Sequence, residues 1–161
     1  MDIINFDSEL NDNCNKYKHH FLLPDCHYMI IAPTGSGKTN LLCNILLRWM
    51  HFDECTIYSI NDSQDKYKCL TEISDILKES GIDNFVKIEN PENIIPIEDL
   101  DDTTVKIIVF DDIKIDTNNM NKVKEYFSLS RNKNCNCIYL TQSFYDVPKY
   151  IRRNTHCFFI F

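Results

Sequence analysis

The sequence contains no long uninterrupted apolar run, because Asn, Asp or Lys breaks the densest hydrophobic stretches every few residues. A membrane-spanning helix needs about 20 consecutive apolar residues, so no membrane span is predicted. Residues 1–20 are polar and acidic and contain no apolar core of a signal peptide. We therefore expect a cytosolic protein.

Glycine and proline are also scarce, with three and five residues in a chain of 161. No linker rich in Pro, Gly or Ser divides the chain, and no internal repeat is visible. Hydrophobic residues make up 43% of the sequence, which is enough for one buried core. We predict a polar arm over residues 1–20 and a single domain over residues 21–161.

The eight cysteines form no C-x-x-C pair, the spacing that many zinc sites use. Cys135 and Cys137 are separated by one residue, and no nearby pair of histidines completes a site. Residues two apart on a strand share a face, so we expect these two to be small core side chains. Free thiols in a reducing compartment are the preferred interpretation, and a metal or redox role is the alternative.

Basic residues are fewer than acidic ones, and the formal net charge is −7. This balance argues against an indiscriminate nucleic-acid binder. The charge is uneven, because basic side chains outnumber acidic ones over residues 117–161 while the preceding residues are strongly acidic. The basic segment is suited to phosphates of a ligand or of DNA, and an ordinary solvated surface is the alternative.

Short β-branched apolar runs alternate along the chain with amphipathic segments. The predicted strands are 27–32, 55–60, 85–88, 105–110, 137–142 and 156–161, and the predicted helices are 38–50, 63–81, 119–132 and 147–154. In the second helix Tyr67, Leu70, Ile73, Ile76 and Leu77 are predicted to face the core. The alternation is typical of a mostly parallel sheet with helices on both faces, so the predicted fold class is three-layer α/β/α.

The segment "APTGSGKTN" (32–40) lies between the first predicted strand and the first predicted helix. It matches the phosphate-loop pattern G-x-x-x-x-G-K-[ST], except that Ala32 stands in the place of the first glycine. Backbone N–H groups of such a loop and of the helix start can surround phosphate oxygens. Lys38 is expected to reach the β- and γ-phosphates and Thr39 to bind Mg²⁺. The predicted nucleotide-binding residues are Pro33, Thr34, Gly35, Ser36, Gly37, Lys38, Thr39 and Asn40.

Two carboxylates, Asp111 and Asp112, follow the predicted strand 105–110. A nucleotide-bound magnesium ion needs a carboxylate at the end of a strand near the phosphate loop. Asp111 is predicted to hold the water shell of Mg²⁺, and Asp112 to orient or deprotonate the attacking water. A helix or turn cap is the alternative role for Asp112.

Gln142 ends the strand that follows the Asp-Asp strand by one helix. Its amide is suited to hold the γ-phosphate or the attacking water, and bonding to loop backbone is the alternative. Arg131, Arg152 and Arg153 are three of the four arginines. Such a cation stabilises a phosphoryl group in transfer, often from a neighbouring subunit, and a surface or DNA-facing charge is the alternative.

Several other phosphate-loop classes lack support in the sequence. A GTPase would carry N-K-x-D and D-x-x-G, whereas "NKNC" (132–135) lacks the aspartate and "DDIK" (111–114) lacks the glycine. No arginine-rich lid of a small-molecule kinase precedes residue 131, and no D-E-A-D box of a helicase is present.

Three segments, "APTGSGKT", "VKIIVFDD" and especially "IYLTQSFYDVPKYIRRN", resemble the genome-packaging ATPases of poxviruses and other large double-stranded DNA viruses, in the FtsK–HerA superfamily. The similarity extends from Pro24 to the last residue. It implies a P-loop NTPase fold in which the Gln142 strand is an additional strand between the Walker A (phosphate-loop) and Walker B (Asp-Asp) strands. It implies ATP and Mg²⁺ as cofactors, with Thr39 and Asp111 at the metal. The implied catalytic residues are Lys38, Asp112, Gln142, Arg152 and Arg153. Gln142 is the implied sensor, and Arg152 or Arg153 is expected to sense the nucleotide or to approach the site of a neighbouring subunit.

The resemblance also implies partners, namely double-stranded DNA, further copies in a ring that is commonly a hexamer, and viral capsid or portal-vertex proteins. The implied location is the virus factory in the host-cell cytoplasm, or the virion. Many cellular relatives have Glu in place of Asp112. Relatives also usually continue beyond the last predicted strand, and for this reason we expect a shortened form or a fragment. The leading hypothesis is a Mg-dependent ATPase motor for viral DNA packaging. The alternatives are an ATP-binding module without turnover and a DNA helicase or repair ATPase.

Overall fold

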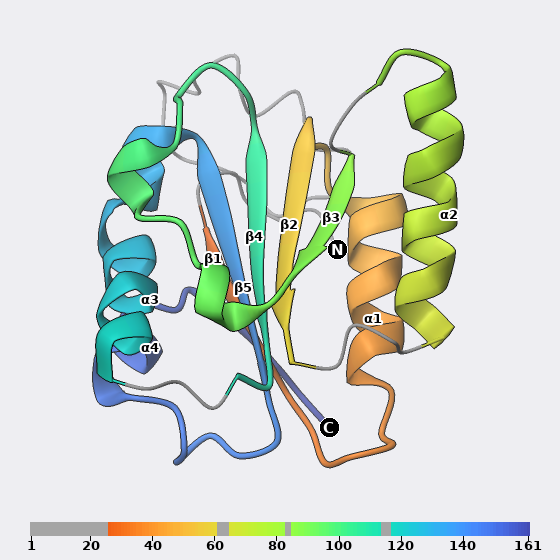
Figure 1. Cartoon of the computed structure of the whole chain (residues 1–161). Coiled ribbons are helices and arrows are strands. Elements are labelled where there is room, and N and C mark those ends of the chain that lie inside the picture. Colours follow the sequence, from red (N-terminus) through yellow and green to blue (C-terminus); the bar gives the residue numbers. More distant parts are fainter. Residues whose placement is uncertain (1–25, 61–64, 83–84, 114–116) are drawn as a thin grey trace, which may run out of the picture.

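The computed structural model describes residues 26–60, 65–82, 85–113 and 117–161, and the predicted arm over residues 1–20 lies outside them. Its centre is a six-stranded sheet in the order β3-β2-β4-β5-β1-β6, in which every neighbouring pair is parallel (Figure 1). The strands are β1 (His27–Ile31), β2 (Glu54–Ser59), β3 (Val86–Glu89), β4 (Lys106–Asp111), β5 (Cys135–Thr141) and β6 (Cys157–Ile160).

Helices cover both faces of the sheet, as Figure 1 shows: α1 and α2 lie on one side, α3 and α4 on the other. Their bounds are α1 (Lys38–Asn44), α2 (Asp65–Glu79), α3 (Thr117–Leu129) and α4 (Lys149–Arg153), and α1 continues as the π-helical segment η2 (Ile45–Trp49). Each face has its own apolar core, with Leu42 and Leu70 in the first and Phe127 and Ile151 in the second. The predicted three-layer α/β fold is therefore confirmed.

The position of β5 confirms the strand order expected from the resemblance. The strand β1, which precedes the glycine-rich loop, and the strand β4, which ends at Asp111, do not touch each other, because β5 pairs with both. Residue Gln142 directly follows β5. The carboxyl ends of β1, β4 and β5 consequently meet at one edge of the sheet.

The two cysteines on β5, Cys135 and Cys137, are core side chains as predicted. Both are fully buried in the core cluster on the side of α3 and α4. The cysteines of the described residues form no disulfide, and these residues contain no group of three His, Cys, Asp or Glu side chains arranged to hold a metal. No helix in the described ranges has the length and hydropathy needed to cross a membrane.

One part of the prediction for α2 is wrong, because Ile76 is 64% exposed. Tyr67 and Leu70 are fully buried, and the Ser74 hydroxyl on the same stripe accepts a hydrogen bond from the backbone of Val86. At about 100° per residue, nine positions put Ile76 on the opposite side of the helix from Tyr67. The predicted apolar stripe was too wide for a helix that packs beside an edge strand.

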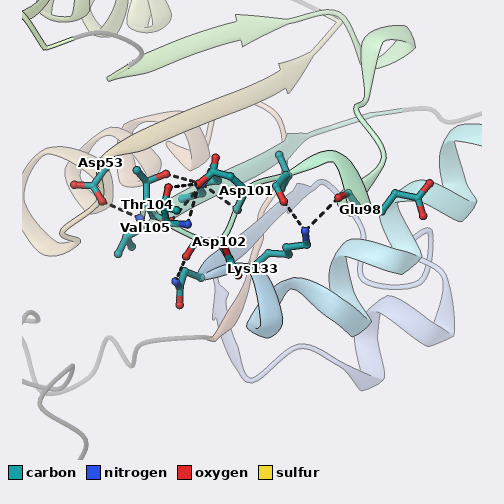
Figure 2. Close-up of polar contacts among 11 residues, drawn as sticks. Asp53, Glu98, Asp101, Asp102, Thr104, Val105 and Lys133 are labelled. Carbon is teal, nitrogen blue, oxygen red and sulfur yellow. Dashed lines mark hydrogen bonds and ion pairs between the residues drawn. The ribbon is translucent and has the colours of Figure 1, made fainter.

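The polar connection between β3 and β4 contains two short 3-10 helices, η3 (Pro91–Asn93) and η4 (Ile97–Asp99). It is tied to the segment that follows α3, the 3-10 turn η5 (Ser130–Lys133) with its C-cap Asn134, by side chains that donate to its backbone, as Figure 2 shows. The Lys133 ammonium donates to the carbonyls of Glu98 and Leu100, and the Asn134 amide donates to the carbonyl of Asp102. Ile94 and Ile97 of the same connection are buried in the second core, so both polar and apolar contacts hold it against that face of the sheet.

Replacing Lys133 tests the value of these contacts. Lys133→Met keeps much of the aliphatic stem but removes the ammonium that donates to two backbone carbonyls. We therefore expect a loss of about 1–3 kcal/mol in the free energy of unfolding. Urea denaturation measures it. The matched control is Lys124→Met on α3, whose ammonium makes, within the described ranges, one contact of 3.4 Å with Asn121 Oδ1. A change within about 0.5 kcal/mol is expected there, and equal effects of both substitutions would contradict the assignment.

Candidate functional site

A cleft of about 510 Å³ opens at the carboxyl ends of β1, β2, β4 and β5. Its lining comes from four separate stretches of the chain, which the parallel sheet brings to one edge. The lining residues are Thr34, Gly35, Gly37, Lys38, Thr39, Ser59, Ile60, Asp111, Asp112 and Gln142. Eight of these ten are residues that the sequence predicts to act together.

The loop between β1 and α1 depends on its two glycines. Gly35 has φ +79° and Gly37 has φ +98°, a left-handed conformation that side-chain-bearing residues rarely adopt. Gly37 is the N-cap of α1, and no side chain caps this helix start. Backbone N–H groups at an uncapped helix start are suited to bind an anion.

Ala32 occupies the place of the first glycine of the phosphate-loop pattern without strain. It is 1% exposed, and its backbone N–H extends the pairing with β5 by donating to the Thr141 carbonyl at 3.1 Å. Its φ is not positive, since the positive values outside glycine in the described chain belong to Asp112 and Asn134. Glycine is therefore not required at this position.

The Lys38 side chain folds over the loop that precedes it. Its ammonium donates to the carbonyl of Ala32 at 2.7 Å and to that of Pro33 at 3.3 Å, and the side chain lines the cleft. A second hydrogen bond to Pro33 comes from the hydroxyl of Ser36. Pro33 and Ser36 thus shape the loop without lining the cleft.

The Asp111 carboxylate lies at the end of β4 and is 6% exposed. Burial raises the pKa of Asp111, and the nearby Asp112 adds to the rise, whereas the Tyr67 hydroxyl and Lys38 oppose it. Two hydroxyls donate to its Oδ2 atom, that of Ser59 at 3.5 Å and that of Tyr67 on α2. The carboxylate is therefore held by fixed donors from two neighbouring elements.

Asp112, Gln142 and Thr34 form a chain of side-chain hydrogen bonds across the cleft. The Gln142 amide nitrogen donates to Asp112 Oδ2, and the Thr34 hydroxyl donates to Gln142 Oε1 at 3.0 Å. Asp112 has φ +47°, so its backbone turns sharply where β4 ends. Gln142 thus bonds to two side chains of the cleft rather than to loop backbone, the alternative that the sequence left open.

The remaining predicted residues lie outside the cleft. Asn40 is exposed on α1, and its carbonyl accepts from Asn44. The Arg152 guanidinium lies 4.7 Å from the centroid of the Phe144 ring, and Arg153 is exposed on the same helix. Arg131 lies 2.8 Å from His156 Nε2. In the described part of the chain no arginine lines the cleft.

Sequence reasoning missed the two hydroxyls that donate to Asp111. Ser59 is the last residue of β2 and lies one residue before the end of the predicted strand 55–60, and the rule that parallel strands end at one edge would have found it. Tyr67 was predicted as a core residue, which is correct for its ring, but nothing in the local sequence indicates that its hydroxyl reaches Asp111. That contact depends on how α2 is rotated against the sheet.

The chemical groups that line the cleft fit a nucleotide with bound Mg²⁺. Mg²⁺ prefers hard oxygen ligands and keeps several waters, and the Thr39 hydroxyl and the Asp111 carboxylate both line the cleft. The uncapped helix start and Lys38 supply positive potential for phosphates. Asp112 is exposed and oriented by Gln142, so it is available to accept a proton from water. These chemical roles remain predictions.

No protein-family model matches the sequence, and no curated protein matches it either. Among solved structures the chain is similar to the cytoplasmic domain of EssC, with a TM-score of 0.50 and 11% identity over 84% of this chain and 31% of that one. A second is the cytoplasmic domain of the Type VII secretion ATPase EccC from Thermomonospora curvata, with a TM-score of 0.45 and 14% identity over 81% of this chain and 18% of that one. A third is C. elegans PCH-2, with a TM-score of 0.40 and 13% identity over 83% of this chain and 33% of that one. The chain spans about a third or less of each of these proteins. The similarity to EssC supports the α/β fold.

Proposed function

We propose that the chain is a Mg-dependent ATPase that acts as a motor and packages double-stranded viral DNA into capsids. The observation that carries the ATPase part is the cleft itself, which unites a left-handed glycine loop, Lys38, Thr39, the Asp111–Asp112 pair and Gln142. Lys38 and the loop bind the phosphates, and Thr39 and Asp111 hold Mg²⁺. Asp112 accepts the proton of the attacking water, which Gln142 helps to orient.

The packaging part of the proposal is supported by the resemblance of the segment 138–154 to packaging ATPases. Double-stranded DNA, viral capsid or portal-vertex proteins and the host-cell cytoplasm are its proposed partners and location. No arginine of the described residues lines the cleft, so we assign the arginine that stabilises the transferred phosphoryl group to a neighbouring copy in a ring.

The test is Mg-dependent release of phosphate from ATP by the purified chain, with and without duplex DNA. Turnover that DNA stimulates supports the motor. The absence of an arginine from the described lining of the cleft also favours a second candidate, an ATP-binding module without turnover. Such a module would bind ATP but release no phosphate, even with duplex DNA. Separation of the strands of a forked duplex would favour a helicase instead.

The basic residues around α4 provide a test of DNA binding. Lys149 and Arg153 are exposed, and Arg152 lies next to them. Replacing all three by Ala is expected to weaken duplex binding and to reduce the slope of log affinity against log salt by up to about 3, since each phosphate contact contributes about one unit. Fluorescence anisotropy over a range of salt concentrations measures the slope.

The matched control removes three exposed cations from the opposite face, by replacing Arg48, Lys68 and Lys78 with Ala. The net charge changes equally, so a purely long-range effect of charge would alter both variants alike. We expect the control to keep most of the salt slope. Equal slopes for the native chain and the α4 variant would show that DNA does not contact this region.

A further inference from the structure

The phenol of Tyr67 connects helix α2 to the carboxylate of Asp111. Tyr67 is fully buried, and its ring packs in the same apolar core as Leu42 of α1 and Val109 of β4. Its hydroxyl donates to Asp111 Oδ2. A buried phenol needs a hydrogen-bond partner, and a carboxylate is a strong acceptor. The ring thus belongs to the core, while the hydroxyl bonds to a carboxylate that lines the cleft.

The donors to Asp111 engage one side of the carboxylate. Ser59 lies directly beside Asp111 in the register of β2 and β4, and its hydroxyl also points to Oδ2, at 3.5 Å. Within the described chain neither hydroxyl donates to Oδ1. Two donors on the same oxygen fix the rotation of a carboxylate that lines the cleft. The other oxygen, Oδ1, is left to bind a ligand that enters the cleft.

We propose that Tyr67 is a positioning residue that, through its hydrogen bond to Oδ2, turns Asp111 Oδ1 toward the magnesium ion of bound ATP. This inference rests on the proposed function, because it requires that Asp111 serve the metal. The apolar packing around the ring makes the donor rigid, so the carboxylate is oriented before the ligand arrives. Tyr67 itself touches neither the nucleotide nor the metal.

Tyr67→Phe tests the inference, since it keeps the buried ring and removes only the hydroxyl. Binding of a fluorescent ATP analogue to the full chain is measured in EDTA and over a Mg²⁺ titration. We expect the half-saturating Mg²⁺ concentration to rise about tenfold, the effect typical of losing an outer hydrogen bond to a metal ligand. The affinity for the analogue in EDTA is expected to stay as in the native chain.

The matched control is Tyr58→Phe. Tyr58 is equally buried, precedes Ser59 on β2 and belongs to the core on the opposite face of the sheet, where its hydroxyl accepts from the backbone of Ile95. The same change at this site is expected to leave the Mg²⁺ dependence unaltered. Ser59→Ala, which removes the longer bond to Oδ2, is expected to shift the dependence in the same direction by a smaller factor. Thermal unfolding without ligand verifies that each variant is folded.

The outcomes separate this inference from the proposed function. If the native chain binds the analogue with a clear Mg²⁺ dependence and Tyr67→Phe behaves identically, the positioning role is overturned and the nucleotide site stands. A lower half-saturating Mg²⁺ concentration in Tyr67→Phe also overturns it, because the hydroxyl then competes with the metal. An equal loss of binding in EDTA and in Mg²⁺ indicates a structural role only. If the native chain does not bind the analogue, both proposals fall.

Discussion

Lys38→Ala is expected to abolish ATP turnover and to weaken ATP binding about 100-fold. In the structure the ammonium donates to the carbonyls of Ala32 and Pro33 and lines the cleft, so it lies beside the backbone N–H groups that would receive the phosphates. A charge-assisted hydrogen bond contributes about 1.5–3 kcal/mol, and 1.4 kcal/mol corresponds to a factor of ten in affinity. Titration with a fluorescent ATP analogue and a phosphate-release assay measure the two effects.

The control for this prediction is Lys68→Ala, which removes an exposed lysine of α2 that is not part of the cleft. Its binding and turnover are expected to match those of the native chain. The thermal midpoint of Lys38→Ala without ligand distinguishes a loss of phosphate contacts from a collapse of the loop. A folded Lys38→Ala chain that binds ATP as tightly as the native chain would contradict the assignment of this loop to the phosphates.

The parts of the site that sequence predicts correctly depend on local patterns. The glycine loop needs left-handed backbone at Gly35 and Gly37, a requirement that is readable from residue type alone. Strand ends are marked by the change from apolar to polar residues, and parallel strands bring Asp111 and Gln142 to the same edge. Since these signals lie within a few residues of the position they describe, both the fold and the cleft follow from them.

The contacts that sequence could not predict join side chains distant along the chain. Tyr67 reaches Asp111 because α2 has one particular rotation against β2, and the amphipathic pattern defined that rotation too loosely to place Ile76. The link from Thr34 through Gln142 to Asp112 depends on the relative positions of two loops. The position of Arg152 was equally unpredictable, because the packing of α4 places its guanidinium on the Phe144 ring and not in the cleft.

Asp112→Asn is expected to lower turnover by about 10²–10⁴-fold, the usual contribution of a positioned proton acceptor, and to leave ATP binding nearly unchanged. The substitution changes few atoms, and Asn tolerates the left-handed backbone of this position, where φ is +47°, as well as Asp does. Its amide can still bond to Gln142 in one of its two orientations. The negative charge and the capacity to take a proton are removed, while the size and the backbone turn are kept. Single-turnover phosphate release with saturating ATP measures the effect on chemistry apart from binding.

The same variant decides between catalysis and the capping role that the sequence left open for Asp112. Asn caps helices and turns about as well as Asp, so a cap predicts native turnover in Asp112→Asn. Asp112→Glu provides the complementary control, because it keeps the carboxylate and lengthens its reach. Turnover is expected to persist in Asp112→Glu, at some cost in stability, since Glu is less suited than Asp to a left-handed backbone. Native turnover in Asp112→Asn together with loss of turnover in Asp112→Glu would mean that this backbone turn, and not the carboxylate, is what the reaction requires.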